Sequence, residues 1–395
     1  MKRRLTLELA AAAGLLLTSA GLAAQTGEPL RVGIITELSG ASADSGRQGR
    51  QVLELFMKQH GDTVAGRKVE ILYRDAPGAS PELARRAAQE LISREKVDFI
   101  GGFGFTPNAI AVAPVVTAAK KPMIIMNTAA TSVITTLSPY VMRMSFTLPQ
   151  VTQPLAEWAA KNGIKTVYTI VTDFGPGTDA EKMFVKTFEA HGGKVIGSVR
   201  TPLANPQFGP FLQRARDEKP DAIFAFNPGG DQAVQFVKAY AERGLAKDGI
   251  KLLTTGDIVD DAFLNKMGDA ALGLISSHHY STAHDSPENK AFVAAYREAY
   301  GAKERTSFYG VGSWDGMSAI YEVARRTNGS FTGEEAMKIL CGLKLTSPRG
   351  PISFDEHCDI VQNVYIRRVE KRDGELYNVE FATFPAVKDP GKAAK

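Results

Sequence analysis

Hydrophobic and polar residues follow two different patterns along this chain, one typical of strands and one typical of helices. Short apolar runs bounded by turn residues, typical of buried parallel strands, occupy residues 30–35, 68–73, 97–100 and 122–126. Between them, residues 46–60 and 81–95 form helical segments, and Leu83, Ala87 and Leu91 show the apolar spacing of a helix. Strands that alternate with helices predict a parallel sheet with helices on both faces.

The same alternation starts again in the second half of the chain. Residues 96–100 and 219–223 are similar in sequence and occupy matching places in the two halves. No low-complexity linker separates the halves, so we expect the chain to cross several times between two lobes with a ligand cleft between them. The expected strands are 166–171, 194–199, 221–226, 250–254 and 271–276, the expected helices 179–191, 208–217, 231–243, 286–300, 313–327 and 333–340, and a hairpin follows at 360–366 and 377–384.

Two turns near the end of the first half are suited to holding a small anion. Residues 101–108 end one strand and open a helix, with Thr106 expected at the N-cap and Pro107 at the first helical position. Residues 127–132 end the next strand. Helix N-termini carry unpaired N–H groups and a positive dipole end, so adjacent turns of this kind predict a carboxylate-sized pocket without Lys or Arg.

Composition and the first residues indicate a secreted globular protein. With 395 residues and 44% hydrophobic content, the chain can form two domains of ordinary size. Residues 1–24 combine a basic start, an apolar stretch and small residues for cleavage after Ala23 or Ala24, which predicts a signal peptide. A membrane anchor is the alternative, but the apolar stretch is short and has Glu8 at its edge. We therefore expect a soluble protein of the bacterial periplasm.

The net charge bears on whether the protein binds nucleic acid, and the cysteine content bears on whether it forms a disulfide. Removing residues 1–24 leaves 44 basic and 42 acidic side chains, a formal charge of about +2, which gives no basic footprint for nucleic acid. Cys341 and Cys358 are the two cysteines of the chain. In an oxidising compartment they can pair if their Cα atoms come within about 7 Å, and two separate thiols are the alternative.

The sequence shows no catalytic set. Residues 102–104 lack the third glycine of a dinucleotide-binding turn, and the mature chain has no phosphate-binding loop. His278, His279 and His284 match no zinc spacing, so we expect neither a metal nor a cofactor. Asp260 and Asp261 are expected to cap a helix, while Asp257 points into the cleft. Binding without turnover is the interpretation, and a hydrolase using the Asp257 region is a minor alternative.

With these features in hand, the chain resembles the leucine/isoleucine/valine-binding protein family, which comprises type I periplasmic binding proteins of ABC transporters. The resemblance implies an α/β fold of two Rossmann-like lobes, with lobe 1 at 29–146 and 278–354 and lobe 2 at 147–277 and 355–386. It also implies a cleft that closes on a ligand and is presented to a membrane permease by a monomeric protein. The segments that carry it are 38–40, 98–106, 126–131, 173–177, 226–230, 256–257 and 347–355.

The resemblance also assigns roles to single residues. Phe103 to Thr106, together with Ala130 and Thr131, match the family's carboxylate-binding elements. Asp257 falls where amino-acid binders place a glutamate for the ligand's ammonium. Asn227 lies in the turn that covers the ligand. The residues expected to bind the ligand are Phe103, Phe105, Thr106, Ala130, Thr131, Gln150, Asn227, Asp257 and Tyr309.

Two departures from the family leave the ligand open. Ser45 stands where amino-acid binders have a tyrosine, and a phenylalanine-rich turn at 103–105 replaces their serine-bearing turn. Phe146, Phe174 and Phe226 belong either to the core or to a ring-binding surface. An aliphatic amino acid and an aromatic carboxylic acid are therefore both candidate ligands. A ligand sensor that signals to a regulator is the alternative to a transport protein.

Overall fold

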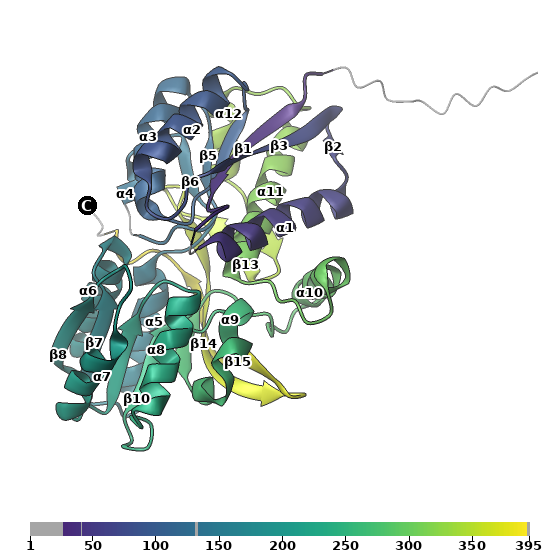
Figure 1. Ribbon diagram of the computed structural model, residues 1–395. Coiled ribbons are helices and arrows are strands. Elements are labelled where there is room, and N and C mark those ends of the chain that lie inside the picture. Colours follow the sequence, from purple (N-terminus) through teal and green to yellow (C-terminus); the bar gives the residue numbers. More distant parts are fainter. Residues whose placement is uncertain (1–26, 41, 131–132, 393–395) are drawn as a thin grey trace, which may run out of the picture.

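The computed structural model describes residues 27–40, 42–130 and 133–392, and the predicted signal peptide lies outside this part of the chain. The described residues form two α/β lobes, one above the other in Figure 1. The first lobe contains a six-stranded sheet. Its strands, in spatial order, are β2 (Thr63–Val64), β3 (Arg67–Asp75), β1 (Leu30–Thr36), β4 (Phe99–Gly102), β5 (Met123–Ile125) and β6 (Val141–Arg143).

Helices cover both faces of the first sheet, because successive strand residues point to opposite sides. Ile34 and Phe99 belong to one apolar core, whereas their neighbours Ile35 and Ile100 belong to the other. One core is shared with α1 (Ala43–His60), α11 (Phe308–Arg326) and α12 (Gly333–Cys341), and the other with α2 (Pro81–Ser93) and α3 (Thr106–Ala119). The short α4 (Val133–Thr136) precedes β6, and α10 (Pro287–Tyr300) contacts α1.

The second lobe is built on a nine-stranded mixed sheet. Strands β7 and β9 to β11 run parallel in its centre, and β14 joins β11 in the antiparallel direction. In spatial order the strands are β12 (Leu345–Ser347), β13 (Gly350–Phe354), β14 (Ile360–Arg372), β11 (Ile275–His278), β10 (Lys251–Thr255), β9 (Ala222–Phe226), β7 (Thr166–Thr172) and β8 (Lys194–Thr201), with β15 (Glu375–Val387) paired to β14.

Helices cover this sheet on both faces as well. In β9, Phe224 packs into one core, and its neighbours Ile223 and Ala225 pack into the other. The first core includes α5 (Leu148–Lys161) and α6 (Gly175–Ala190). The second includes α7 (Phe208–Asp217), α8 (Asp231–Glu242), α9 (Asp261–Met267) and the adjoining 3₁₀ turn at Gly268–Ala271. The predicted two-lobed α/β fold is therefore confirmed.

The chain passes between the lobes at residues 144–147, 279–286 and 342–349. The third passage leads into β12 and β13, which the sequence did not predict as strands. Residues 345–354 were assigned to lobe 1, but their backbone is hydrogen-bonded into the second sheet through β14. The side chain of Ile352 nevertheless packs into the first lobe's core. This hairpin therefore belongs to both lobes.

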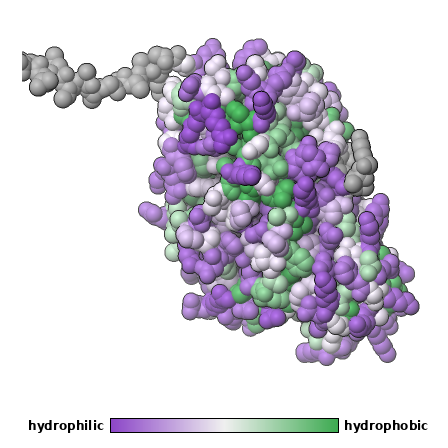
Figure 2. Space-filling model, turned by 180° about the vertical axis from the view of Figure 1, so that it is seen from behind, coloured by the Kyte–Doolittle hydropathy of each residue, from purple (hydrophilic) through white to green (hydrophobic). Residues whose placement is uncertain are grey.

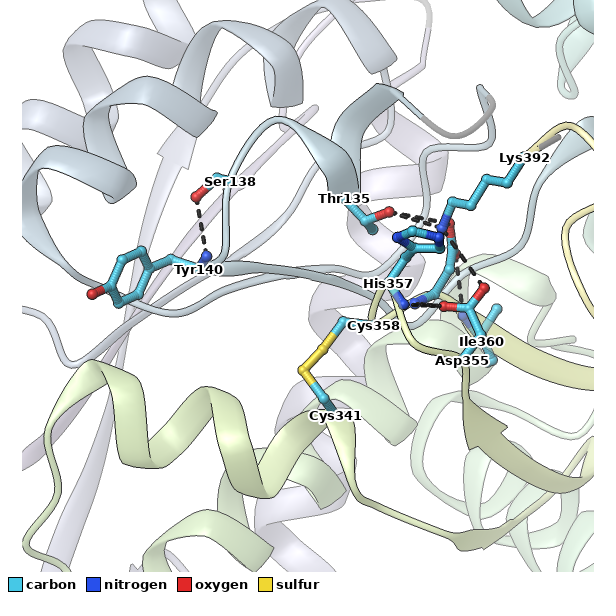
Figure 3. The surroundings of a disulfide bond; sticks show 10 residues. Thr135, Ser138, Tyr140, Cys341, Asp355, His357, Cys358, Ile360 and Lys392 are labelled. Carbon is cyan, nitrogen blue, oxygen red and sulfur yellow. Dashed lines mark hydrogen bonds and ion pairs between the residues drawn. A yellow bond between two sulfur atoms is a disulfide. The ribbon is translucent and has the colours of Figure 1, made fainter. Parts of the chain in front are cut away.

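A disulfide joins Cys341 at the end of α12 to Cys358 just before β14, with the Cα atoms 4.9 Å apart. Figure 3 shows the bond next to the loop that carries Asp355 and His357. The pairing left open by the sequence is thus present in the structure. The bond closes the hairpin β12–β13 at its base, where the chain leaves the first lobe.

The start of α11 differs from the prediction for a steric reason. The helix was expected from residue 313, but it begins at Phe308. A Cβ atom at position 312 would lie 2.1 Å from the main-chain oxygen of Met126. The glycine therefore lets the helix approach the end of β5, which brings Phe308 and Tyr309 to the cleft.

Seen from behind, hydrophilic residues dominate the outline and hydrophobic residues gather toward the centre (Figure 2). Among the described helices, none has the length and apolar character needed to cross a bilayer.

Candidate ligand-binding site

A small cavity of about 50 Å³ lies where the two lobes meet. Larger hollows beside α6 and β8 and beside α7 are lined by the second lobe alone, so they lack the two-sided enclosure expected of a cleft site. The cavity between the lobes is lined by Gly104, Phe105, Thr106, Asn127, Ala129, Phe308 and Tyr309 from the first lobe and by Leu148, Phe174, Pro176, Phe226, Pro228 and Asp257 from the second.

The turn between β4 and α3 presents Phe105 to this cavity and turns Phe103 away from it. Phe103 has a backbone φ of +68° and is 1% exposed in the core beside α2 and α3. Its side chain does not line the cavity, so the expectation that both phenylalanines contact a ligand is corrected to Phe105 alone. The positive φ angles of Gly102 and Phe103 direct the side chains of Phe103 and Phe105 to different sides of the turn. Sequence reasoning did not predict this difference.

Thr106 connects the two predicted anion-binding turns. It was expected to cap α3, but it is the first residue of the helix, and its hydroxyl accepts a hydrogen bond from Ala130 N at 3.4 Å. A bond of this length is weak, so both groups can turn to a ligand. Thr131, the other threonine expected here, lies outside the described residues.

Arg143 on β6 holds the second turn from behind. Its guanidinium donates to the carbonyl oxygens of Ala130 at 2.8 Å and Thr128 at 3.3 Å. It also forms an ion pair with Asp359 at 2.8 Å, and both side chains are fully buried. Because these carbonyls face Arg143, the positive charge fixes the turn without lining the cavity. The sequence did not single out this residue.

Gln150 was expected in the cleft, but the structure places its side chain between α5 and the strands β14 and β15 of the second lobe. Its amide donates to the carbonyls of Ile360 and Val387, at 2.9 and 2.7 Å, and accepts from Gln362 at 2.9 Å. With these partners the fully buried side chain ties α5 to β14. Gln150 is therefore corrected from a ligand contact to a support of the second lobe.

Aromatic rings form much of the cavity wall. Phe174 and Phe226, which follow β7 and end β9, stack with their ring centres 6.0 Å apart. Phe308 and Tyr309 at the start of α11 lie 4.3 Å apart on the other lobe. Together with Phe105, these rings make the cavity suited to a flat apolar group. Sequence reasoning named Phe174 and Phe226 without deciding between core and cleft, and it did not name Phe308.

The polar groups at the cavity come from both lobes. Asn127 donates its side-chain amide to the main-chain oxygens of Met126 and Tyr309, at 2.8 and 3.2 Å. Asn227 lies between the lining residues Phe226 and Pro228, and its buried side-chain oxygen has no hydrogen-bond partner in the described part of the chain. Asn227 was expected to bind the ligand from the turn that covers it, and the structure places its side chain beside the cavity.

Asp257, in the turn after β10, brings a buried carboxylate to the cavity. It is 7% exposed, and Oδ2 has no hydrogen-bond partner among the described residues. Burial raises the pKa of Asp257 from its ordinary value to about 6. The Nε2 atom of His278 is 3.9 Å from Oδ2, and burial holds the pKa of this histidine well below its usual range. The pair is therefore a neutral imidazole beside a carboxylate.

Asp260 and Asp261 were both expected to cap a helix, and the structure confirms this for Asp260 alone. Asp260 caps α9 by accepting from Ala262 N at 2.8 Å. Asp261 is the first residue of the helix and instead binds Thr282 and Asn378. Neither lines the cavity. Among the described residues, no group of three or more His, Cys, Asp or Glu is placed to hold a metal ion.

Tyr309 and Glu37 complete the first lobe's side of the site. Burial raises the pKa of the Tyr309 hydroxyl above its usual range, and the Ser45 hydroxyl is its hydrogen-bond partner. Glu37, which follows β1, accepts from Gly104 N at 3.2 Å, and burial raises its pKa to about 7. A Cβ at position 104 would lie 2.2 Å from the Glu37 carboxylate, so glycine there leaves room for this side chain in its present position. Sequence reasoning did not identify Glu37.

Comparison with known proteins assigns the family. A family model described as "Periplasmic binding protein" matches residues 29–375, most of the chain. The chain belongs to this periplasmic binding protein family. A curated relative from Brucella melitensis, named Leu/Ile/Val-binding protein homolog 6, is 42% identical over 368 residues, 93% of this chain and 94% of that protein.

Solved structures of similar periplasmic binding proteins contain aromatic acids. A solute-binding protein of an ABC transporter from Rhodopseudomonas palustris BisB5, in complex with 3,4-dihydroxybenzoic acid, is 50% identical with a TM-score of 0.89, covering 92% of this chain and 99% of that one. A second, from Rhodopseudomonas palustris HaA2 with p-hydroxybenzoic acid, is 44% identical with a TM-score of 0.90, covering 93% and 100%. The family resemblance inferred from the sequence is thereby confirmed.

Proposed function

We propose that this periplasmic binding protein captures a single-ring aromatic carboxylate between its lobes and delivers it to the membrane permease of an ABC importer. The observation that carries the proposal is the ring of aromatic side chains, Phe105, Phe174, Phe226 and Phe308, around a compact cavity contributed by both lobes. Such walls bury a flat ring on both faces, and apolar burial supplies the main attraction.

The ligand's carboxylate is proposed to lie at the first lobe, against the N-terminus of α3. Its partners are the Thr106 hydroxyl and the N–H groups of the turns at 104–106 and 129–130. Helix N-termini favour anions through their free N–H groups and dipole, so Lys and Arg are not required. Each charge-assisted hydrogen bond contributes roughly 1.5–3 kcal/mol, enough for two or three to fix the ligand's orientation.

An aliphatic amino acid is the second candidate ligand. Two observations favour it: the name of the Brucella melitensis relative, and the unpartnered carboxylate of Asp257, which would attract an ammonium group. The two solved relatives with 3,4-dihydroxybenzoic acid and p-hydroxybenzoic acid support the aromatic acid instead. The aromatic lining of this chain agrees with the latter.

A ligand panel separates the two candidates. The mature protein is unfolded, dialysed free of ligand and refolded, and its Tm is measured with leucine, isoleucine, valine, phenylalanine, benzoate and 4-hydroxybenzoate. A ligand that binds only the native state raises Tm by mass action. We expect a rise with the aromatic acids alone and a weaker effect for Thr106→Val. A rise with the aliphatic amino acids alone would overturn the proposal.

The cellular role is proposed from the same family. Periplasmic location is supported by the predicted signal peptide and the family, and presentation to a permease is supported by the ABC-transporter context of the solved relatives. Uptake of a radiolabelled aromatic acid into right-side-out vesicles that carry the cognate permease should require this protein in the external medium. Uptake that is unchanged without it would favour a sensor. Light scattering should give the mass of a monomer.

A further inference from the structure

We propose that Asp257 accepts a hydrogen bond from a hydroxyl group on the ligand's ring, which makes the protein selective for hydroxylated benzoates over benzoate itself. The inference rests on the proposed function and identifies the residue that recognises the hydroxyl substituent of the ring. It concerns a carboxylate on the second lobe, across the cleft from the turns proposed to hold the ligand's own carboxylate.

The Asp257 carboxylate is built into the cavity wall, and one of its oxygens lacks a partner there. Its side chain is 10% exposed, the Thr255 hydroxyl lies beside the carboxylate, and Oδ2 makes no hydrogen bond among the described residues. An acceptor buried without a donor costs free energy, about as much as a hydrogen bond contributes. A ligand that supplies one donor at this point removes that penalty, and a ligand without a donor leaves it in place.

The cationic neighbour of Asp257 does not satisfy this oxygen. Arg367 on β14 is buried behind the turn, where it donates to Ser276 Oγ at 3.1 Å and to the Tyr280 carbonyl. Its Nη2 atom has no hydrogen-bond partner among the described residues. The positive charge favours the ionised form of Asp257, and an ionised carboxylate only accepts hydrogen bonds. The ionised Asp257 carboxylate can therefore accept a hydrogen bond from a donor on the ligand.

A ring hydroxyl suits this position better than an ammonium group. An ammonium group carries three donors and a positive charge, whereas a phenolic hydroxyl carries one donor. Around Asp257 the lining is apolar, with Phe174, Phe226 and Pro228 on the same lobe. The free oxygen of Asp257 therefore matches the single donor of a hydroxyl group at the edge of a ring.

The test compares ligands that differ at one ring position. Dissociation constants of the refolded protein are measured by calorimetry for benzoate, 4-fluorobenzoate and 4-hydroxybenzoate. We expect 4-hydroxybenzoate to bind about tenfold to a hundredfold more tightly than the other two, the range of a hydrogen bond to a charged group. Asp257→Leu, which removes the acceptor at similar volume, should abolish this preference while benzoate affinity stays equal or improves.

Three controls keep the outcome interpretable. Asp257→Asn, close in shape, should retain the wild-type fold by circular dichroism and lose most of the preference. Thr106→Val acts at the carboxylate end and should weaken all three ligands by the same factor. Asp217→Asn, which removes an exposed carboxylate from α7 of the same lobe, should change none of them.

The possible failures point to different conclusions. If the wild type binds benzoate as tightly as 4-hydroxybenzoate, or if Asp257→Leu keeps the preference, the inference is overturned while the proposed function stands. If no aromatic acid binds and leucine does, the proposed function itself fails, and Asp257 becomes the ammonium partner.

Discussion

At the scale of single residues, buried charge on the first lobe's side of the site serves to shape turns. Glu37 holds Gly104 N, and Arg143 holds the carbonyls of Thr128 and Ala130. Neither side chain lines the cavity. Sequence reasoning located the turns because their Gly, Thr and Pro residues have local backbone preferences. It could not find Glu37 or Arg143, since their partners lie 67 and 13 or more residues away.

The raised pKa of Glu37 predicts a pH-dependent stability. Because its pKa is about 7 in the folded chain against an ordinary 4.5, the stability it contributes is fully present below about pH 4.5 and is lost as pH rises through 7. His278 and His279 have the opposite effect: burial lowers their pKa, so they reduce the stability of the folded chain as pH falls below about 6.5. Both histidines are also present in Glu37→Gln, so the difference in stability between the wild type and this variant removes their contribution.

We therefore expect the Tm of the wild type, relative to Glu37→Gln, to fall steadily between pH 5 and pH 8. Differential scanning calorimetry in buffers of constant ionic strength measures this difference. A difference that stays constant across the range would show that Glu37 does not titrate in it.

Arg143 offers a second prediction at this scale. Lysine cannot bind Asp359 and both turn carbonyls at once, so Arg143→Lys should lower the unfolding free energy by about 3 kcal/mol and weaken ligand binding about tenfold. Urea denaturation and calorimetry measure the two effects. Arg31→Lys disturbs a partly exposed pair with Glu70 and should cost no more than about 1 kcal/mol. Equal losses in both variants would contradict the positioning role.

At the scale of elements, the pattern of hydrophobic residues predicted most strands and helices of both lobes, because central strands such as β1, β4, β7 and β9 are buried on both faces. Predictions were weakest where tertiary contacts decide. The α11 start depends on the contact between Gly312 and Met126, and the hairpin β12–β13 exists through pairing with β14. Phe103 and Phe105 differ only in the side to which a twisted turn directs them. None of these features is local in sequence.

The disulfide predicts how the hairpin contributes to stability. Cys341 and Cys358 are 17 residues apart, and closing a loop of this size stabilises a protein by about 3 kcal/mol in the chain-entropy model. The double variant Cys341→Ser/Cys358→Ser should lose about that much in urea denaturation. Ligand affinity should change less than twofold, since neither cysteine lines the cavity. A large loss of affinity would instead make the hairpin part of the binding mechanism.

At the scale of the whole molecule, the cavity exists because both lobes contribute to it. A second, polar pocket also has walls from both lobes, with Asp44 and Arg47 of α1 facing Lys266 of α9. The lobes are thus close together in this arrangement. Three passages of a few residues connect them, and a rotation about these passages can open the cleft. Such a rotation has to shift the apolar contacts that Val52, Phe308 and Val311 of the first lobe make with the core around α5 and α6.

Closure predicts a change in overall size on binding. Small-angle X-ray scattering of refolded, ligand-free protein should give a larger radius of gyration than the same sample with saturating 4-hydroxybenzoate. Binding stabilises the arrangement in which the ligand touches both lobes, so the population shifts toward it. Acetate, which lacks the ring, serves as the control and should leave the scattering curve unchanged. Identical curves with and without 4-hydroxybenzoate would exclude domain closure.

The three passages also govern how the polypeptide acquires its shape. Apolar packing in the first lobe joins Leu30 to Ile360, and packing in the second joins Leu148 to Ile366. Neither lobe can finish its core while its late segments are still being synthesised, so the halves cannot mature one after the other. The newborn chain consequently stays loosely organised until nearly complete, the condition in which a polypeptide threads through a narrow export channel.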